Sequence, residues 1–385
     1  MTIRMTDVPF FSLYIHVPFC RSKCPYCAFY SFCPRSGQMD RWCEDVLREL
    51  DLLKETLPAP SAFSTIYAGG GTPSFLPLPL WKKLGKALAG LPKTAEAEFT
   101  VEANPDSLSL DKLKLWKECG VNRISLGIQS LDDGELKCIA RPHSALQALH
   151  ALDLCMNEGF RASGDLIFGL PGQTMRRWHA SLSGLLRQGL EHLSVYQLMI
   201  EPDSFWGRHR PAGLPDGYGM YRWAQYYLPR KGLKQYEIAS FAVPGQESRH
   251  NCAYWRRKNV CALGPAAWGF RDGTRFANSG DFERWASCVE SGQSPVDFEE
   301  RLTGGEEASE AAILALRMST GIELRSFSER YGKPWLKEIL RRLQDLPQDD
   351  LQWSEGRVAL SPRGMRVGNS IWAELMDLDR PKGTL

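Results

Sequence analysis

Short apolar runs alternate with helical repeats through the first half of this 385-residue chain, and this alternation constrains its fold most strongly. The candidate strands are Leu13–Val17, Thr65–Ala68, Phe99–Ala103, Arg123–Ile128, Gly164–Phe168 and Leu193–Leu198. The candidate amphipathic helices between them are Arg41–Lys54, Leu80–Ala89, Leu110–Glu118, Ala145–Glu158 and Met175–Gln188. Strands that alternate with helices form parallel sheets. We therefore expect an α/β fold with a partial (β/α)6 barrel, whose active site lies at the carboxyl ends of the strands.

The composition is typical of a globular protein without a strong charge. Hydrophobic residues make up 43% and charged residues 24%, and the net charge is +2, so no nucleic-acid partner is indicated. Residues 1–11 lack the apolar core of a secretory signal, and no run of 18 apolar residues predicts a membrane span. We expect a cytoplasmic protein, with peripheral attachment to a membrane left open. Most of its 11 cysteines are then expected to be free buried thiols.

Three cysteines directly follow the first candidate strand. Cys20, Cys24 and Cys27 have the spacing C-x3-C-x2-C. Thiolates suit soft metal centres, and a cluster of four irons needs one ligand per iron, so three cysteines leave one iron open for chemistry. A zinc site and a disulfide are the alternatives. A zinc ion would need further ligands, and the nearest candidates are Cys33, Cys43 and His16. None of these completes a familiar zinc-finger spacing. A disulfide needs an oxidising compartment.

Glycines and polar residues occupy the ends of the following strands. The loop Gly69–Ser74 reads GGGTPS, and glycines let backbone amides approach a ligand closely, although such a triplet also suits a flexible turn. Glu102 ends the third strand and Gln129 the fourth. A helix cap or a surface acid is the alternative role for Glu102. Asp165 interrupts the apolar fifth strand, and a buried acid needs a partner, such as ribose hydroxyls or Arg141.

A second distinctive segment, His250–Trp255, reads HNCAYW. An imidazole, a thiol and a phenol within five residues are all possible iron ligands, and Tyr254 and Trp255 offer flat faces suited to a porphyrin. From the residues alone, however, the favoured interpretation is a buried aromatic segment with a hydrogen-bonded histidine.

The cysteine spacing, with Tyr26 before the third cysteine, resembles the signature of the radical S-adenosylmethionine (SAM) superfamily. The motifs from about Tyr14 to Phe276 together resemble its coproporphyrinogen dehydrogenase-like branch. This resemblance implies a [4Fe–4S] cluster on Cys20, Cys24 and Cys27, with SAM on its open iron. The residues that it implies for SAM binding are Tyr14, Gly70, Gly71, Thr72, Glu102, Gln129, Arg141 and Asp165.

The string H-N-x-x-Y-W is similar to the haem-binding motif of the haem chaperones within this branch. The resemblance implies a haem site at His250, Asn251, Tyr254 and Trp255, transfer of haem to a client haemoprotein such as a respiratory one, and a reductant for the cluster. Coproporphyrinogen decarboxylation, or another radical SAM reaction on haem, is the alternative, and no catalytic residue is assigned. The dehydrogenase carries a fourth cysteine where this chain has Phe29, which argues against decarboxylation.

The chain also departs from the branch at two positions. Trp268 stands where a histidine is usual, and Ile139-Ala140 precedes Arg141 where Leu-Gly is usual. These changes suggest a divergent member of the branch.

The expected domains are a core barrel with the cluster loop (1–230), a connector with the HNxxYW segment (231–300) and a small domain (301–385). Residues 282–295 are expected to be part of the connector. In the last domain, the predicted helices are Glu306–Met318 and Pro334–Gln344, and the predicted hairpin is Leu351–Ser354 with Arg357–Leu360. Two helices and a hairpin predict a winged-helix-like fold. The absence of a dense basic face favours a lid or docking role over DNA binding.

Overall fold

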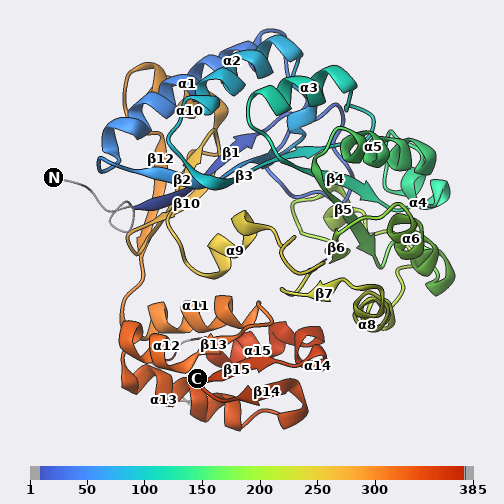
Figure 1. Cartoon of the computed structure of the whole chain (residues 1–385), viewed down its shortest axis with the longest axis vertical. Helices are drawn as coiled ribbons and strands as arrows, with labels where there is room; N and C mark the ends of the chain where they lie inside the picture. Colours follow the sequence, from blue (N-terminus) through green and yellow to red (C-terminus); the bar gives the residue numbers. More distant parts are fainter. Residues whose placement is uncertain (1–8, 377, 379–385) are drawn as a thin grey trace.

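A computed structural model describes residues 9–376 and 378 of the chain. Most of the amino-terminal stretch from which we inferred the lack of a secretory signal, residues 1–8, lies outside the described residues. Figure 1 shows a large sheet with helices along its outer side and a smaller helical part below it. The short helix α9 (Arg249–Trp255) lies between the two. Among the described helices, none combines the length and the apolar character that crossing a bilayer requires.

Six parallel strands form the centre of the sheet, as predicted. They are β1 (Phe10–Val17), β2 (Ala62–Gly70), β3 (Lys93–Ala103), β4 (Arg123–Gln129), β5 (Arg161–Phe168) and β6 (His192–Gln197). Each strand pairs in parallel with the next one along the chain. No pairing joins β6 back to β1 among the described strands, so the barrel stays open. The expected α/β class with a partial (β/α)6 barrel is confirmed.

Amphipathic helices cover the outer face of these strands (Figure 1). They are α1 (Gln38–Thr56), α2 (Leu78–Ala89), α3 (Leu110–Glu118), α4 (Asp133–Cys138), α5 (Ala145–Asn157) and α6 (Met175–Arg187). In α1, the buried residues Trp42, Val46 and Leu50 recur every four positions and so form one apolar face. At the start of α5, Ser144 and Gln147 form a reciprocal capping box, which satisfies backbone amides that the helix leaves unpaired. Helices α1, α2, α3, α5 and α6 bury their apolar faces in one core with the strands.

Further strands extend both edges of the sheet. On the β1 side lie β9 (Val260–Leu263), β10 (Trp268–Arg271), β11 (Thr274–Asn278) and β12 (Val296–Arg301), and β9 alone among them runs parallel to its neighbour β1. On the β6 side lie β8 (Ser240–Ala242) and β7 (Lys234–Gln235), both antiparallel, and the helices α7 (Phe205–Arg208) and α8 (Tyr218–Tyr227) precede them. Strand β9 therefore lies along β1, the strand that leads into the cysteine loop.

The prediction that residues 282–295 only connect two parts of the chain was wrong. Helix α10 (Phe282–Glu290) lies there, and Asp281 caps it by accepting from the amides of Glu283 and Arg284. Phe282, Trp285 and Val289 are buried in the main hydrophobic core. Their spacing of three and four places them on one face of the helix.

The carboxyl-terminal part has a hydrophobic cluster of its own. Its elements are α11 (Gly304–Leu316), β13 (Ile322–Glu323), α12 (Leu324–Tyr331), α13 (Lys333–Gln344), β14 (Leu351–Ser354), β15 (Arg357–Leu360), α14 (Pro362–Arg366) and α15 (Gly368–Leu375). The predicted hairpin and the two predicted helices are present, and α12, α14 and α15 are additional helices. The domain boundaries at residues 230 and 300 stay a prediction.

Candidate functional site

The three cysteines lie on the loop that leaves the carboxyl end of β1. The loop is closed at its base, where the Cys20 amide donates to Phe32 O at 3.0 Å and the Phe32 amide donates to Pro18 O at 2.8 Å. Cys20, Cys24 and Cys27 are all free and half-buried. Burial raises the pKa of the Cys20 and Cys27 thiols, so thiolates there need a compensating positive charge, which a metal centre provides.

The glycine loop after β2 packs against this cysteine loop. The Gly71 amide donates to Val17 O at 2.8 Å, and the Thr72 amide donates to Phe19 O at 2.8 Å. A Cβ atom at Gly71 would lie 2.8 Å from both carbonyl oxygens, those of Val17 and Phe19, so the position has no room for a side chain. Thr72 Oγ1 lies 3.4 Å from Cys20 Sγ. Glycine is therefore required here for two loops to meet.

Arg141 joins the cysteine loop to the strand ends. Its guanidinium donates to Cys24 Sγ at 3.6 Å, to Asn104 Oδ1 at 2.6 Å and to Gly127 O at 2.7 Å. Its Nε is buried and has no partner among the described residues. Cys24, Thr72, Asn104 and Arg141 also line one small pocket. The guanidinium thus brings positive charge to the Cys24 thiol.

Glu102 is half-buried at the end of β3 and is already hydrogen-bonded, so it is not a free surface acid. It accepts from the Tyr67 hydroxyl at 2.6 Å and from the Gly70 amide at 3.0 Å. Burial raises the pKa of its carboxyl to about 7, and the nearby Asp165 adds to this shift. A cation placed beside Glu102 would favour the charged carboxylate.

Asp165 does not pair with Arg141, which corrects one of the two partners that we expected. Its Oδ2 accepts from the Ser125 hydroxyl on the neighbouring strand at 3.0 Å. Burial raises the pKa of Asp165 to about 6.

Gln129, at the end of β4, has φ +68°, a left-handed conformation that turns the chain sharply after the strand. The hydroxyl of Tyr14 on β1 lies 2.9 Å from His16 Nδ1.

His250 is the most enclosed of the predicted ligands, with 1% of its surface exposed. Its Nδ1 lies 2.8 Å from Thr65 Oγ1, whereas its Nε2 is buried without a hydrogen-bond partner among the described residues. The ring stacks on Tyr67 at 4.9 Å and on Tyr14 at 6.4 Å between centroids. Burial lowers the pKa of His250 to about 3, so the imidazole is neutral. When Nδ1 donates to Thr65, the lone pair on Nε2 is free.

The segment that contains His250 faces two parts of the molecule. Tyr254 meets the His250 ring edge-on at 5.4 Å, on the side of the barrel. Trp255 instead meets Arg317 of the carboxyl-terminal part, with 4.2 Å between the guanidinium carbon and the centroid of the indole ring. The Asn251 amide donates to Ser248 Oγ at 3.3 Å within the first turn of α9. The four predicted haem residues therefore bridge the barrel and the carboxyl-terminal part.

Two positions where the chain departs from the family pattern are exposed. Phe29 is 70% exposed, and its backbone oxygen accepts from Lys23 Nζ at 3.1 Å. Trp268 on β10 is 54% exposed and packs against Phe298 of β12 with 5.3 Å between ring centroids. At the remaining departure, Ile139-Ala140, the side chain of Ile139 is buried and the backbone of Ala140 has a positive φ of 54°.

The donor set suits a cluster rather than a single ion. Over the described residues, no three His, Cys, Asp or Glu side chains form a site for one metal ion. In a four-iron cluster each thiolate binds a different iron, so the sulfur atoms lie further apart than the ligands of one ion do. The loop with Cys20, Cys24 and Cys27, flanked by Arg141, fits such a cluster. Cys43 is buried in the main core, and so does not join it.

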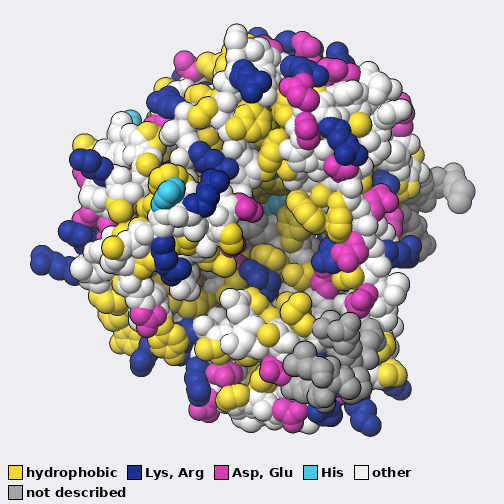
Figure 2. Space-filling model, turned by 180° about the vertical axis from the view of Figure 1, so that it is seen from behind, with side chains coloured by type: hydrophobic (Ala, Val, Ile, Leu, Met, Phe, Trp, Pro, Cys, Tyr) yellow, Lys and Arg dark blue, Asp and Glu magenta, His cyan; other side chains and the backbone are white. Residues whose placement is uncertain are grey.

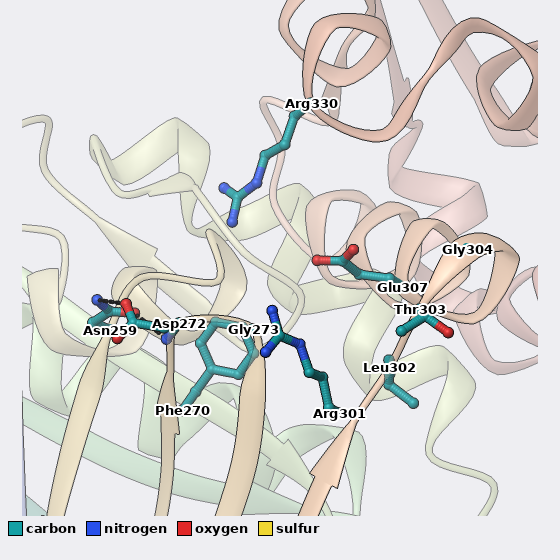
Figure 3. Close-up of a pocket in the computed structure, with 10 residues that line it drawn as sticks. All are labelled: Asn259, Phe270, Asp272, Gly273, Arg301, Leu302, Thr303, Gly304, Glu307 and Arg330. Atoms are coloured by element: carbon teal, nitrogen blue, oxygen red, sulfur yellow. Dashed lines mark hydrogen bonds between the residues drawn. The ribbon is translucent and has the colours of Figure 1, made fainter.

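A hollow opens at the centre of the molecule on the face shown in Figure 2. A separate pocket of about 500 Å³ lies between the end of the sheet formed by β10, β11 and β12 and helices α11 and α12 (Figure 3). Arg301 and Arg330 approach this pocket from its two sides, and Glu307 also lines it. It contains none of the residues predicted from the sequence motifs, so its size alone does not make it the functional site.

The comparisons with known proteins agree with this geometry. Residues 14–183 match the family model of the radical SAM superfamily, and residues 302–367 match that of the HemN C-terminal domain. The heme chaperone HemW of Bacillus subtilis (strain 168) is 34% identical over 376 residues, which cover 95% of this chain and 99% of that protein. This chain belongs to the HemW family.

Other relatives support the assignment to the HemW family. The heme chaperone HemW of Escherichia coli (strain K12) is 38% identical over 284 residues, covering 70% of this chain and 73% of that protein. The solved structure of coproporphyrinogen III oxidase (HemN) from Escherichia coli superposes with a TM-score of 0.84 over 97% of this chain and 91% of that chain. Its sequence is 21% identical, so this likeness concerns the fold. Membership of the radical SAM superfamily brings a [4Fe–4S] cluster and SAM as cofactors, and the cysteine loop fits them.

Sequence reasoning missed several residues of the site, notably Thr65, Tyr67 and Asn104. Thr65 and Tyr67 alternate with apolar residues along β2, and with Gly69 they lie on one face of the strand. This alternation of polar residues in a central strand was the signal that could have found them. Asn104 directly follows the end of β3, where ligand-binding residues of such barrels occur.

Proposed function

We propose that this chain is a haem chaperone, which binds haem at His250, Asn251, Tyr254 and Trp255 and passes it to a client haemoprotein. The free Nε2 of His250 carries this proposal. A neutral imidazole whose other nitrogen is held by a hydrogen bond is the form in which histidine binds iron. The names of the curated relatives, heme chaperones of the HemW family, support the same role.

We also propose how the cofactors are held. Cys20, Cys24 and Cys27 are the proposed cluster ligands. The proposed SAM contacts are Tyr14, Gly70, Gly71, Thr72, Glu102, Gln129, Arg141 and Asp165. In this arrangement the Glu102 carboxylate pairs with the ammonium of SAM, Asp165 accepts from the ribose hydroxyls, and Arg141 stays beside the thiols. The cluster needs a reductant only if SAM is cleaved, and we expect an external electron donor in that case.

Haem access requires a movement of α9. The His250 side chain is 1% exposed, because α9 is enclosed between the barrel and the carboxyl-terminal part. We propose that residues 301–385 act as the lid or docking domain that controls this movement. A client haemoprotein would bind there and receive haem when α9 opens.

The test is a haem titration of the anaerobically reconstituted chain, followed by absorbance. We expect stoichiometric binding by the wild type and loss of the histidine-bound spectrum in His250→Ala. His150→Ala is the matched control, because His150 is exposed on α5. Equal, weak and non-stoichiometric binding by wild type and His250→Ala would sink the proposal. Transfer is tested by mixing the haem-loaded chain with an apo-haemoprotein and following the holo-protein spectrum.

The same anaerobic sample tests the alternative activity. With SAM, a reductant and coproporphyrinogen, we expect no decarboxylated product, because Phe29 occupies the position of the fourth cysteine. Formation of protoporphyrinogen would instead identify the chain as a coproporphyrinogen dehydrogenase. Conversion of bound haem to another product would identify a different radical SAM reaction.

A further inference from the structure

Arg317 is a cation held between two tryptophan rings where α11 ends. Its guanidinium carbon lies 4.2 Å from the centroid of Trp255 and 5.0 Å from that of Trp372. Trp255 belongs to α9 and Trp372 to α15, so the guanidinium lies where the haem segment meets the carboxyl-terminal part. Stacking on aromatic faces fixes the plane of a guanidinium and leaves its N–H groups available at the edge.

No acceptor uses these N–H groups in the part of the chain that the structure describes. The Arg317 guanidinium forms no hydrogen bond and no ion pair there, and its Nε is buried. The nearby Arg257, in contrast, pairs with Glu307 and Glu310 at 3.0 Å each. The buried Nε is left without an acceptor, which costs free energy, so this position suits an anionic ligand that supplies one.

Glu237, the acid that acts electrostatically on Arg317, does not accept a hydrogen bond from its guanidinium. Glu237 is 3% exposed, and its carboxylate is already hydrogen-bonded to Ser240, while no ion pair joins it to Arg317 among the described residues. The end of α11 offsets part of the positive charge through the helix dipole, but it gives the guanidinium no acceptor. Arg317 therefore keeps its capacity to bind a carboxylate in the bidentate geometry that guanidinium groups favour.

We propose that Arg317 binds a propionate carboxylate of haem, an inference that rests on the proposed haem site. Trp255 follows His250 by five residues on α9, which corresponds to an axial rise of about 7.5 Å. This rise is on the scale of the separation between the iron of a haem and the edge that carries its propionates. The five-residue step also turns by about 140° around α9, so the haem has to extend from the barrel side of the helix to Arg317. The Arg317 guanidinium interacts electrostatically with Tyr196 and Tyr221 and so lies within reach of the barrel, and the indole rings offer flat apolar contacts beside it.

The test compares haem with haem dimethyl ester, in which both propionates are neutral. The wild type should bind haem roughly 10- to 100-fold more tightly than the ester, the range expected for a charge-assisted hydrogen bond. Arg317→Gln should lose this preference and keep the histidine-bound absorbance spectrum. Arg317→Lys, which keeps the charge, should retain part of the preference and guards against a folding defect in the glutamine variant.

Arg256→Gln is the matched control, because Arg256 is exposed and adjoins the same tryptophan. We expect this variant to keep the full preference for haem over the ester. A preference retained in Arg317→Gln, or lost equally in Arg256→Gln, overturns the role of Arg317 and leaves the haem chaperone proposal intact. A wild type that binds haem no better than His250→Ala contradicts the proposed function itself and this inference with it.

Discussion

The rings of Tyr67 and His250 stack, with their centroids 4.9 Å apart and their planes 21° from parallel. The hydroxyl of the same tyrosine donates to Glu102 Oε1 at 2.6 Å. One side chain therefore contacts both the acid proposed for SAM and the imidazole proposed for haem. The two contacts use different parts of the tyrosine: the ring packs on His250, and the hydroxyl donates to Glu102.

Replacing Tyr67 by Phe should weaken SAM binding by about 3- to 10-fold, the cost of one lost hydrogen bond. The hydroxyl helps to hold down the pKa of Glu102, which burial has already raised to about 7, so its loss leaves less carboxylate to pair with the SAM ammonium. Haem binding should change little, because the ring under His250 remains. Equilibrium titrations of both ligands on one anaerobic sample measure the two effects. A loss of haem affinity as large as the loss of SAM affinity would contradict this separation.

Gly71→Ala should reduce the iron and sulfide content of the reconstituted chain by more than half. The new Cβ would lie 2.8 Å from Val17 O and Phe19 O, so the cysteine loop has to shift. Iron and acid-labile sulfide per chain are the measurement. Gly219→Ala is the control, since a Cβ there meets no atom within 4 Å. Full cluster content in Gly71→Ala would show that the two loops tolerate separation.

The regular part of the fold could be predicted because its causes are local. Strands buried on both faces need apolar runs, and helices that pack on a sheet need one apolar face. The spacing of apolar residues therefore predicts the positions of these strands and helices to within a few residues. The same reasoning failed for α10, where Phe282, Trp285 and Val289 carried the helical period. The interpretation of this short segment as a connector overlooks Asp281, which precedes the helix and is a capping signal.

The partners of the site residues depended on tertiary packing and could not be predicted. Arg141 and Asp165 suggested a pair by charge, yet the guanidinium reaches Asn104 and Cys24 instead. Side-chain rotamers and turns such as that at Gln129 decide which side chains meet at the strand ends. The periodicity of apolar residues in the sequence predicts neither the rotamers nor the turns. Likewise, the motif located His250 but did not indicate that one of its nitrogens lacks a partner.

Glu49 should make the stability of the wild type pH-dependent. Its buried carboxyl accepts from the Gly264 amide at 2.8 Å, from Asn278 Nδ2 at 2.6 Å and from Trp285 Nε1 at 3.0 Å. Burial raises its pKa to about 7 in the fold, above the ordinary value of 4.5. Since the folded state then binds more protons, this group's contribution is full below pH 4.5 and is lost as pH rises through about 7.

Comparing Glu49→Gln with the wild type in denaturant unfolding at pH 5 and pH 8 isolates this effect. Glutamine cannot titrate, so the wild type should lose up to about 3 kcal/mol more than the variant between the two pH values. Other titrating groups cancel in the difference. A gap between the two proteins that does not change with pH would mean that Glu49 titrates in the fold as it does when unfolded.

Arg257 should hold the carboxyl-terminal part against the barrel. Its side chain is 3% exposed and lies 3.0 Å from both Glu307 and Glu310 of α11. Arg257→Gln leaves two acids without this cation, although Glu310 keeps Arg275, so we expect a loss of about 2–3 kcal/mol in the free energy of unfolding. Because α9 opens for haem in the proposed function, the variant should also take up haem several-fold faster. Arg284→Gln, which breaks an exposed pair with Asp297, should change stability by less than about 1 kcal/mol and leave haem uptake unchanged. Slower uptake in Arg257→Gln would show that this ion pair shapes the haem site rather than restraining α9.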